Sequence, residues 1–160
     1  MTIRLATIRD IEIFAAAYFD FLCEKDLVWS GVPSSVLARA IDSFTEGAFR
    51  QALSGVKGCA AVAEVDGQVV SSVVLIYDDN HSIGRAAVCF LIHTHRDFRK
   101  RGYAKKLLAW AEKRAFLEGC KVLETAVLDT NTSSKALMLG AGYQPFGILV
   151  RKPLDLNAGE

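Results

Sequence analysis

Apolar and polar positions in the first third of the chain predict one short strand and two helices. Residues 3–6 form the strand. Thr7 and Asp10 have the spacing of a capping box, the reciprocal pairing of groups that begins a helix, so a helix is expected over 8–22. Proline favours the first position of a helix, and Pro33 is therefore expected to begin the second one.

The middle of the chain has the pattern of three consecutive strands. Asp66-Gly67, a pair typical of a two-residue hairpin turn, separates apolar runs over 58–65 and 68–77. A second turn follows, and a third strand is predicted over 85–94. Strands that follow one another through such short turns pair in the antiparallel direction.

An amphipathic helix is predicted over 102–118, ended by Gly119. Its apolar side chains recur at helical spacing and mark one face: Ala104, Leu107, Leu108, Ala111 and Ala115. After this helix the pattern predicts a buried strand over 122–128, a short helix over 132–141 and a final strand over 146–154.

The order of these elements is β-α-α-β-β-β-α-β-α-β and predicts an α/β fold. We expect a mixed, mostly antiparallel central sheet with helices on both faces. One parallel β-α-β crossover joins the strand over 85–94 to the strand over 122–128. A chain of 160 residues without repeats or linkers is expected to form a single domain over 1–160.

The composition is that of a folded protein with no strong overall charge. Half of the residues are apolar (51%), and 19 basic against 18 acidic residues give a net charge of +1. We find no signal-peptide pattern and no apolar run that could cross a bilayer, which predicts a cytoplasmic protein without a membrane partner. The cysteines lie in apolar contexts without C-x-x-C spacing and are expected to be free buried thiols, with no metal site: Cys23, Cys59, Cys89 and Cys120.

The most informative segment is 88–108, where an apolar strand passes through a basic turn into the amphipathic helix. The first N–H groups of a helix have no partners inside the helix, and the helix dipole favours negative charge there. Six cationic side chains within 96–106 reinforce this preference: Arg96, Arg99, Lys100, Arg101, Lys105 and Lys106. The segment therefore predicts a site for a phosphate-bearing cofactor.

The spacing of the turn excludes both the Rossmann fingerprint and the P-loop. Residues 99–104 read R-K-R-G-Y-A, the form R-x-x-G-x-A. This resembles the acyl-CoA signature Q/R-x-x-G-x-G/A of the GNAT superfamily of N-acyltransferases. Residues 92–99 are similar to the V-Y-T-x-P-E-Y-R that ends the family's fourth strand. Residues 3–10 resemble the family's opening I-R-x-A-T-x-x-D, and residues 128–143 resemble its closing strand, helix and "G-F".

The resemblance implies a GNAT-like acyltransferase that uses acetyl-CoA as co-substrate and acetylates a primary amine by direct attack in a ternary complex. The pantetheine arm would lie between the strands over 85–94 and 122–128. The pyrophosphate would rest on backbone N–H groups of the basic turn. The residues that the resemblance places at the cofactor are Thr94, His95, Arg99, Lys100, Arg101, Gly102, Tyr103, Ala104, Lys105 and Asn131. Asn131 has an alternative role, as the N-cap of the helix over 132–141.

The catalytic groups follow from the resemblance only in part. The family often carries N-x-x-A-x-x-L-Y with a tyrosine acid near the sulfur, and here Met138 holds that position and cannot donate a proton. A thiol of pKa about 8.5 leaves readily as thiolate, so a slower enzyme or one that uses water as the acid is expected. His93 is the candidate base and His95 a weaker one, although a histidine at a strand end is often a plain surface residue. Glu64 and Asp129 are further candidates.

Two functions of other classes stay open. Met138 is compatible with an acyl-CoA-binding sensor that has lost catalysis. The cationic segment 96–106 could serve a nucleic-acid-binding module, but Phe98 and Tyr103 are its only aromatic residues, which is meagre for tracking a strand. The acceptor, a small-molecule or peptide amine, is not fixed by the helices over 8–22 and 34–53, and a second subunit could complete its side of the site.

Overall fold

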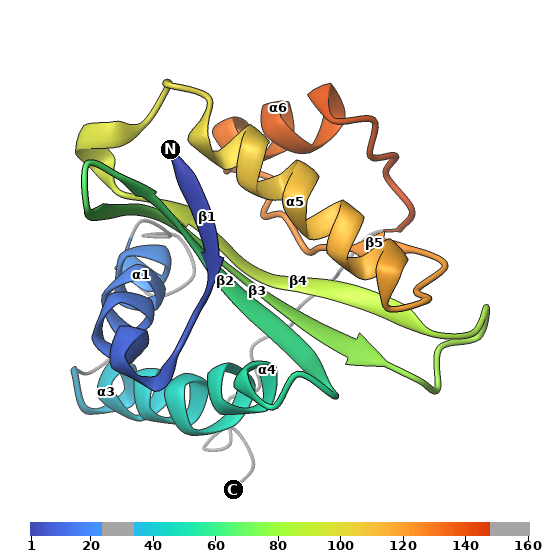
Figure 1. The fold of residues 1–160 in the computed structure, drawn as a ribbon, viewed down its shortest axis with the longest axis horizontal. Coiled ribbons are helices and arrows are strands. Elements are labelled where there is room, and N and C mark those ends of the chain that lie inside the picture. Colours follow the sequence, from blue (N-terminus) through green and yellow to red (C-terminus); the bar gives the residue numbers. More distant parts are fainter. Residues whose placement is uncertain (24–33, 148–160) are drawn as a thin grey trace, which may run out of the picture. The chain divides into compact units, whose positions relative to one another are not determined.

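The computed structural model describes residues 1–23 and 34–147 of the 160-residue chain (Figure 1). The chain divides into two compact units, Met1–Leu128 and Asp129–Glu160. The first unit holds the sheet and the helices that cover it. The described part of the second unit holds the helix α6 (Thr132–Gly140).

The first unit begins with one strand and a series of helices, as the sequence pattern predicts. These elements are β1 (Thr2–Leu5), the 3₁₀ turn η1 (Ile8–Asp10), α1 (Ile11–Cys23), α3 (Ser34–Ser43), the π-helical segment η2 (Phe44–Phe49) and α4 (Arg50–Leu53). The last three follow one another without a break, so the second predicted helix does continue to residue 53. Residues 24–33, which include Pro33, lie outside the described residues.

The rest of the first unit contains the strands of the hairpins and the helix after the basic turn. These elements are β2 (Gly58–Val65), β3 (Gln68–Asp78), β4 (Ala86–Thr94), the 3₁₀ turn η3 (Arg96–Phe98), α5 (Tyr103–Leu117) and β5 (Leu123–Glu124). The turn between β2 and β3 is the predicted one, because Asp66 (φ 51°) and Gly67 (φ 77°) both have the positive φ of a type I′ hairpin.

The five strands form one sheet in the order β1-β2-β3-β4-β5. Neighbours from β1 to β4 are antiparallel, and β5 pairs with β4 in the parallel direction. The crossover from β4 to β5 runs through α5. The predicted mixed, mostly antiparallel sheet with one parallel crossover is therefore confirmed.

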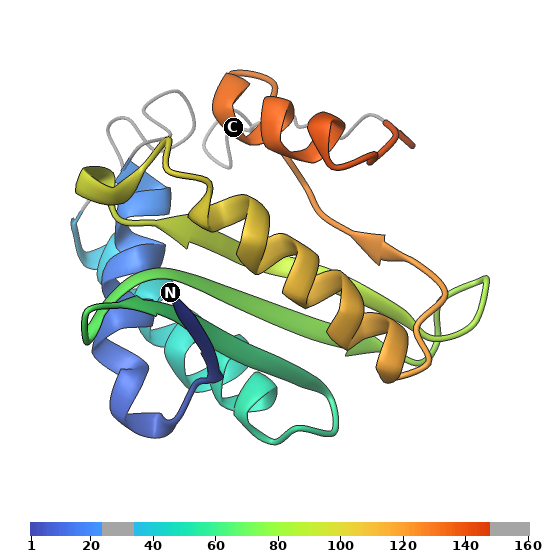
Figure 2. The same cartoon turned by 45° about the horizontal axis from the view of Figure 1, so that its top comes forward.

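Helices cover both faces of this sheet (Figures 1 and 2). On one face the apolar side of α5 packs on the strands through Leu107, Ala111 and Ala115. On the other face α1, η2 and α4 form a second apolar cluster that includes Phe14 and Phe49. The apolar positions that define α5 in the sequence are thus core positions, with Leu108 also buried.

The strand after α5 is much shorter than predicted. The sequence predicts a buried strand over 122–128, but β5 pairs with β4 only at Ala87–Leu123 and Val88–Glu124. Neither paired residue of β5 is fully buried. The prediction was wrong here because an apolar run predicts that a segment is buried but does not predict where two paired strands separate. Of the final strand predicted over 146–154, residues 146 and 147 are not in a strand, and the rest lies outside the described residues.

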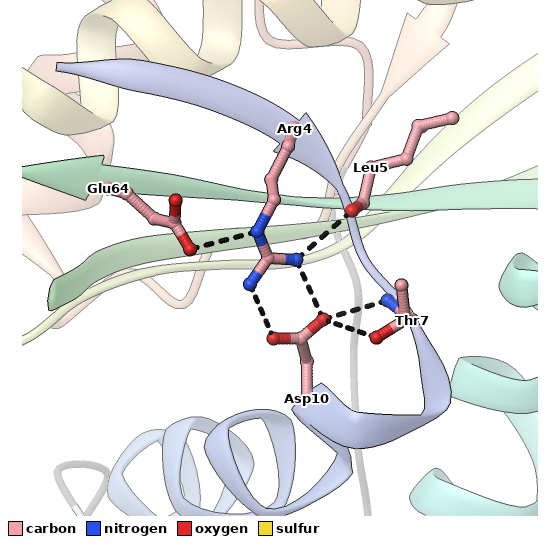
Figure 3. A network of polar contacts seen from close by, with 5 residues as sticks. All are labelled: Arg4, Leu5, Thr7, Asp10 and Glu64. Carbon is pink, nitrogen blue, oxygen red and sulfur yellow. Dashed lines mark hydrogen bonds and ion pairs between the residues drawn. The ribbon is translucent and has the colours of Figure 1, made fainter. Parts of the chain in front are cut away.

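The predicted capping box forms the centre of a polar network that ties the start of the chain to the sheet (Figure 3). Thr7 donates both its backbone N–H (2.8 Å) and its hydroxyl (3.1 Å) to the Asp10 carboxylate. Arg4 donates two further hydrogen bonds to Asp10, at 2.9 and 2.8 Å, and its Nε donates to Glu64 at 2.8 Å. The network therefore joins β1, η1 and β2.

Three of the cysteines are free thiols, as expected. Cys59 and Cys89 are buried, Cys120 is half-buried, and the side chain of Cys23 lies outside the described residues. Burial raises the pKa of the Cys89 thiol to about 12. Within residues 1–23 and 34–147, we find no helix with the length and apolar character needed to cross a membrane.

Candidate functional site

The basic turn between β4 and α5 has an unusual backbone that exposes N–H groups. Lys100 (φ 61°) and Gly102 (φ 80°) both lie in the left-handed region. Gly102 is the N-cap of α5, and its carbonyl accepts the N–H of Lys106 at 3.1 Å. In the described part of the chain, no hydrogen bond engages the N–H groups of residues 103–105. The turn therefore presents the helix N-terminus that the sequence predicts for an anion.

The cationic side chains of the turn are all exposed, but two of them also contact neighbouring residues. Arg99 donates from Nε to the carbonyl oxygen of Thr94 at 2.9 Å, which fixes the turn against the end of β4. The guanidinium of Arg101 lies 5.4 Å from the ring centroid of Phe98. Lys100 and Lys105 are exposed to solvent. Arg99 thus shapes the turn, while the two lysines are placed to meet a ligand.

A side chain at position 102 would extend into open space. A Cβ built on Gly102 has no protein atom within 4 Å. The glycine therefore satisfies a positive φ and, at the same time, keeps the approach to the neighbouring N–H groups clear.

Beyond the turn, β4 continues past the point where β5 leaves it. The last registered pair is Val88–Glu124, after which the Thr125 hydroxyl donates to the Cys89 carbonyl at 3.0 Å. β4 itself runs on to Thr94. Among the described residues, the segment of β4 beyond Cys89 is thus an unpaired edge on the β5 side.

The end of β4 is held firmly from the other side by β3. The buried Ser71 hydroxyl donates to the His93 carbonyl at 2.6 Å and lies 2.9 Å from the Thr94 hydroxyl. His95 donates its N–H to the Val70 carbonyl at 3.0 Å. In an antiparallel strand the N–H and C=O groups of successive residues point alternately toward one neighbouring strand and toward the other. Since His93 and His95 bond to β3, the backbone groups of Ile92 and Thr94 point away from it.

A β-bulge interrupts β4 at Phe90. Leu75 registers with Cys89 and Val74 with Leu91, so Phe90 has no partner residue in β3. Its ring is 43% exposed and contacts the rings of Tyr18 and Phe44 on the α1 side. A bulge cannot be seen in the apolar pattern, and the sequence analysis therefore missed this residue.

The two histidines at the end of β4 have different partners. His93 Nε2 lies 3.4 Å from Asp20 Oδ2, a carboxylate contributed by α1. β4 ends at Thr94, so strand alternation does not extend to His95. The His95 ring lies beside Phe98, and its Nδ1 accepts the N–H of Asp97 at 3.4 Å. Only His93 is therefore paired with a carboxylate from another element, and Asp20 is a residue that the sequence analysis did not single out.

The other candidate bases are engaged elsewhere. Glu64 accepts a hydrogen bond from Arg4 in the network of Figure 3. In the second unit, the hydrogen bond from Lys135 lowers the pKa of Asp129. The charged form of Asp129 is thus favoured, which weakens it as a proton acceptor. The carboxylate of Glu64 is occupied by Arg4.

In the second unit, Asn131 is the N-cap of α6. Its side-chain oxygen accepts the Ser134 N–H at 3.1 Å, and its amide donates to the Ser134 hydroxyl at 2.6 Å. The alternative structural role considered for Asn131 is thus confirmed. Met138, in the position of the family's tyrosine, is a buried residue of the same helix.

The sequence was compared with models of known families. The model described as the Acetyltransferase (GNAT) family matches residues 26–143. The chain belongs to this family. The match includes β4, the basic turn and α5, so the residues that resemble the family's acyl-CoA signature lie within it.

A curated relative of this GNAT chain is an acetyltransferase of Yersinia enterocolitica. The two are 37% identical over 70 residues, which are 44% of this chain and 46% of the relative. An acetyltransferase of Yersinia pestis (strain Pestoides F) is 36% identical over 70 residues, with the same coverage of 44% and 46%. The alignment thus spans about half the length of the curated relatives.

Solved structures of GNAT acetyltransferases share the fold. A ribosomal-protein-alanine N-acetyltransferase from Brucella melitensis is 21% identical, with a TM-score of 0.68, and the match covers 95% of this chain and 100% of that one. At such identity the likeness shows the fold alone. It agrees with the mixed sheet and its single parallel pair.

Proposed function

We propose that this GNAT protein is an N-acetyltransferase that transfers the acetyl group of acetyl-CoA to a primary amine by direct attack in a ternary complex. The observation that carries the proposal is the basic turn, where Lys100 and Gly102 adopt positive φ. The first N–H groups of α5 have no hydrogen-bond partner among residues 1–23 and 34–147. Such N–H groups bind phosphate oxygens, and the surrounding cations add to the attraction.

The turn fits the diphosphate of coenzyme A. The Arg99 N–H donates to the Arg96 carbonyl at 3.3 Å, so the N–H groups from Lys100 to Lys105 would bind the oxygens of the diphosphate. The exposed Lys100 and Lys105 would neutralise its charge. Arg99 and Tyr103 would act by shaping the turn, and Ala104 by its small size in the first helical turn. The open space at Gly102 supports this proposal, because it lets a phosphate group approach the backbone.

The edge of β4 would hold the pantetheine arm. Since the carbonyl of Thr94 accepts Arg99 and the N–H of His95 binds Val70, we assign the arm to the N–H of Thr94 and the backbone of Ile92. The arm would then lie along β4 as an additional strand, and His95 would border it. For Asn131 the proposal rests on the family's motif together with its place at the start of α6.

The chemistry requires one proton acceptor on the protein. As the amine nitrogen bonds to the acetyl carbon, the carbon–sulfur bond breaks and the thiolate of CoA leaves. His93 would accept the proton that the amine loses, since it lies at the end of β4 with Asp20 beside it. Met138 provides no acid, and the thiolate, of pKa about 8.5, leaves without one.

The relatives support the same activity. An aminoglycoside N-acetyltransferase solved in complex with CoA is 16% identical, with a TM-score of 0.66, over 96% of this chain and 93% of that one. The curated Yersinia relatives are named acetyltransferases. A sensor without catalysis is the second candidate, and the observation that favours it is Met138 in place of the family's tyrosine.

The proposal is tested first by ligand binding. We expect acetyl-CoA and CoA to raise the melting temperature of the protein, because a ligand that binds only the folded state stabilises it. Pantetheine without phosphates should raise the melting temperature much less at the same concentration. Equal shifts for the two ligands would contradict the assignment of the turn to phosphate.

Turnover then separates the enzyme from the sensor. The protein with acetyl-CoA is incubated with a panel of primary amines, and acetylated products are detected by mass spectrometry. An N-acetyltransferase acetylates at least one amine faster than the uncatalysed reaction. A sensor binds acetyl-CoA with the same thermal shift and forms no product.

A further inference from the structure

Phe90 is the exposed outer member of a stack of aromatic rings on the α1 face of the sheet. Phe44, from η2, is buried and lies 4.3 Å from the ring of Tyr18 in α1, measured between centroids. The Phe90 ring covers both, at 5.8 Å from Phe44 and 6.2 Å from Tyr18. A single exposed phenylalanine is ordinary, but this one is fixed on two other rings at a bulge.

The bulge puts Phe90 on the same face of β4 as His93. Cys89 belongs to the core cluster under α5, whereas Phe90 and Leu91 both contact the α1 side. His93 faces α1 as well, through Asp20. His93 follows Phe90 by three positions, about 10 Å along β4. An aromatic surface and a proton acceptor therefore lie on the same face of β4.

This face carries no lysine or arginine on its two main elements, α1 and β4. The helix α1 contributes the carboxylates of Glu12 and Asp20. An approaching ammonium group is attracted by carboxylates and by the faces of aromatic rings. A carboxylate on the acceptor, in contrast, meets no lysine or arginine on α1 or β4.

We propose that Phe90, Asp20 and His93 form the acceptor side of the site and select a primary amine that carries an aromatic or aliphatic hydrocarbon group and no carboxylate. The inference rests on the proposed function. Phe90 holds the hydrocarbon group, and His93 accepts the proton of the amine. Asp20 is a positioning residue: its carboxylate 3.4 Å from Nε2 fixes the imidazole and stabilises the imidazolium form.

Three amines test the selectivity: 2-phenylethylamine, phenylalanine and ethanolamine. We expect kcat/KM for 2-phenylethylamine to exceed the values for ethanolamine and phenylalanine by about tenfold or more, because ethanolamine lacks the ring and phenylalanine adds a carboxylate. Phe90→Ala should lower kcat/KM for 2-phenylethylamine by about tenfold, mainly through KM, and change that for ethanolamine little. Phe116→Ala, which removes an exposed ring at the far end of α5, is the matched control and should change neither.

The role of Asp20 is tested by its pH profile. Asp20→Asn removes the charge beside His93, so the acidic limb of kcat/KM should move to lower pH and kcat should fall by about tenfold or more. In His93→Gln that limb should vanish. Asp20→Glu should restore part of the rate. An Asp20→Asn protein with the wild-type rate and pH profile would overturn the positioning role.

A binding measurement separates this inference from the proposed function. The affinity of 2-phenylethylamine is measured by calorimetry on the protein saturated with CoA. If the wild type binds the amine and Phe90→Ala does not, the acceptor site stands even when no product forms. If the enzyme acetylates ethanolamine or phenylalanine with the same kcat/KM as 2-phenylethylamine, the proposed acceptor site is wrong and the proposed function stands.

Discussion

Two left-handed residues shape the basic turn, and only one of them is a glycine. Gly102 has φ 80°, where glycine meets no steric cost, but Lys100 has φ 61° and is not a glycine. Non-glycine residues in this region are uncommon and store strain. At Lys100 the strain is held between Arg99, bonded to Thr94, and Arg101, stacked on Phe98. The side chains that look like a simple charge run therefore also maintain the backbone of the site.

The role of Gly102 can be separated from its conformation by a matched pair of variants. Gly102 and Gly119 have nearly the same φ, 80° and 79°, and an added Cβ meets no atom within 4 Å at either position. They lie at opposite ends of α5. We expect Gly102→Val and Gly119→Val to lose similar stability, about 1–2 kcal/mol from backbone strain. Thermal unfolding of the two variants measures this loss.

Only Gly102→Val should also lose acetyl-CoA affinity, measured by calorimetry on the folded protein. We expect a loss of about tenfold or more, the effect of removing one charge-assisted hydrogen bond to phosphate. Gly119→Val should bind as the wild type does. A folded Gly102→Val protein with unchanged affinity would rule out a close approach of phosphate to this turn.

At the scale of single residues, the sequence predicts those parts of the site that are contiguous in the chain. The turn from Arg99 to Lys105 and the cap at Asn131 follow from short motifs whose geometry is local. The pairing of Asp20 with His93 does not, because it depends on where α1 lies on the sheet. The exposure of Phe90 depends on a bulge, which alters the register of two strands and leaves no trace in the apolar pattern.

At the scale of elements, the order and bounds of the long helices and strands could be predicted, and β5 could not. The long elements carry a full period of apolar residues, so their burial determines their type. β5 has only two paired residues. Its pairing ends where the Thr125 side chain replaces the backbone ladder with a bond to Cys89. Divergence of two strands is a property of the pair, which a single sequence segment does not encode.

The first strand is fixed to its neighbours by a buried carboxylate, and this makes a prediction about pH. The hydrogen bonds from Arg4 hold the pKa of the Asp10 carboxyl down to about 2 against the opposing effect of burial, and the Thr7 N–H contributes. A depressed pKa adds stability above the unfolded value of about 4, and that stability is lost as the pH falls toward 2. We expect Asp10→Asn to cost about 2 kcal/mol at pH 7 and little at pH 2, measured by denaturant unfolding.

The control for this prediction is an ion pair without burial. Glu46 and Arg50 form an i,i+4 pair whose side chains are 64% and 49% exposed. Exposed pairs of this kind contribute little to stability. Glu46→Gln should therefore leave the unfolding free energy nearly unchanged at both pH values. If Glu46→Gln lowers the free energy of unfolding as much as Asp10→Asn does, the network of Figure 3 contributes no more to stability than an exposed ion pair.

At the scale of the whole molecule, the positive charge is concentrated in the segment 96–106, and the aromatic rings of this segment pack against the core. The net charge is +1, although six cations lie within residues 96–106. Phe98 and Tyr103, the aromatic residues of this segment, pack against the core cluster under α5. They are therefore not stacking platforms for bases, and the nucleic-acid-binding alternative loses the feature that it would need most.

The salt dependence of binding tests this distribution of charge. The proposed site would bring acetyl-CoA against a few cations at one turn, so its affinity should fall by only about three- to tenfold between 50 and 500 mM NaCl. Dephospho-CoA, which keeps the diphosphate and loses the 3′-phosphate, should show a shallower dependence. Single-stranded DNA and RNA should bind weakly at 50 mM NaCl and not measurably at 200 mM. A few cations on a nearly neutral protein attract a nucleic acid only weakly at 200 mM NaCl, whereas the cofactor would also bind the backbone N–H groups of the turn. A nucleic acid that binds more tightly than acetyl-CoA at this salt concentration would therefore overturn the assignment of the turn to the cofactor.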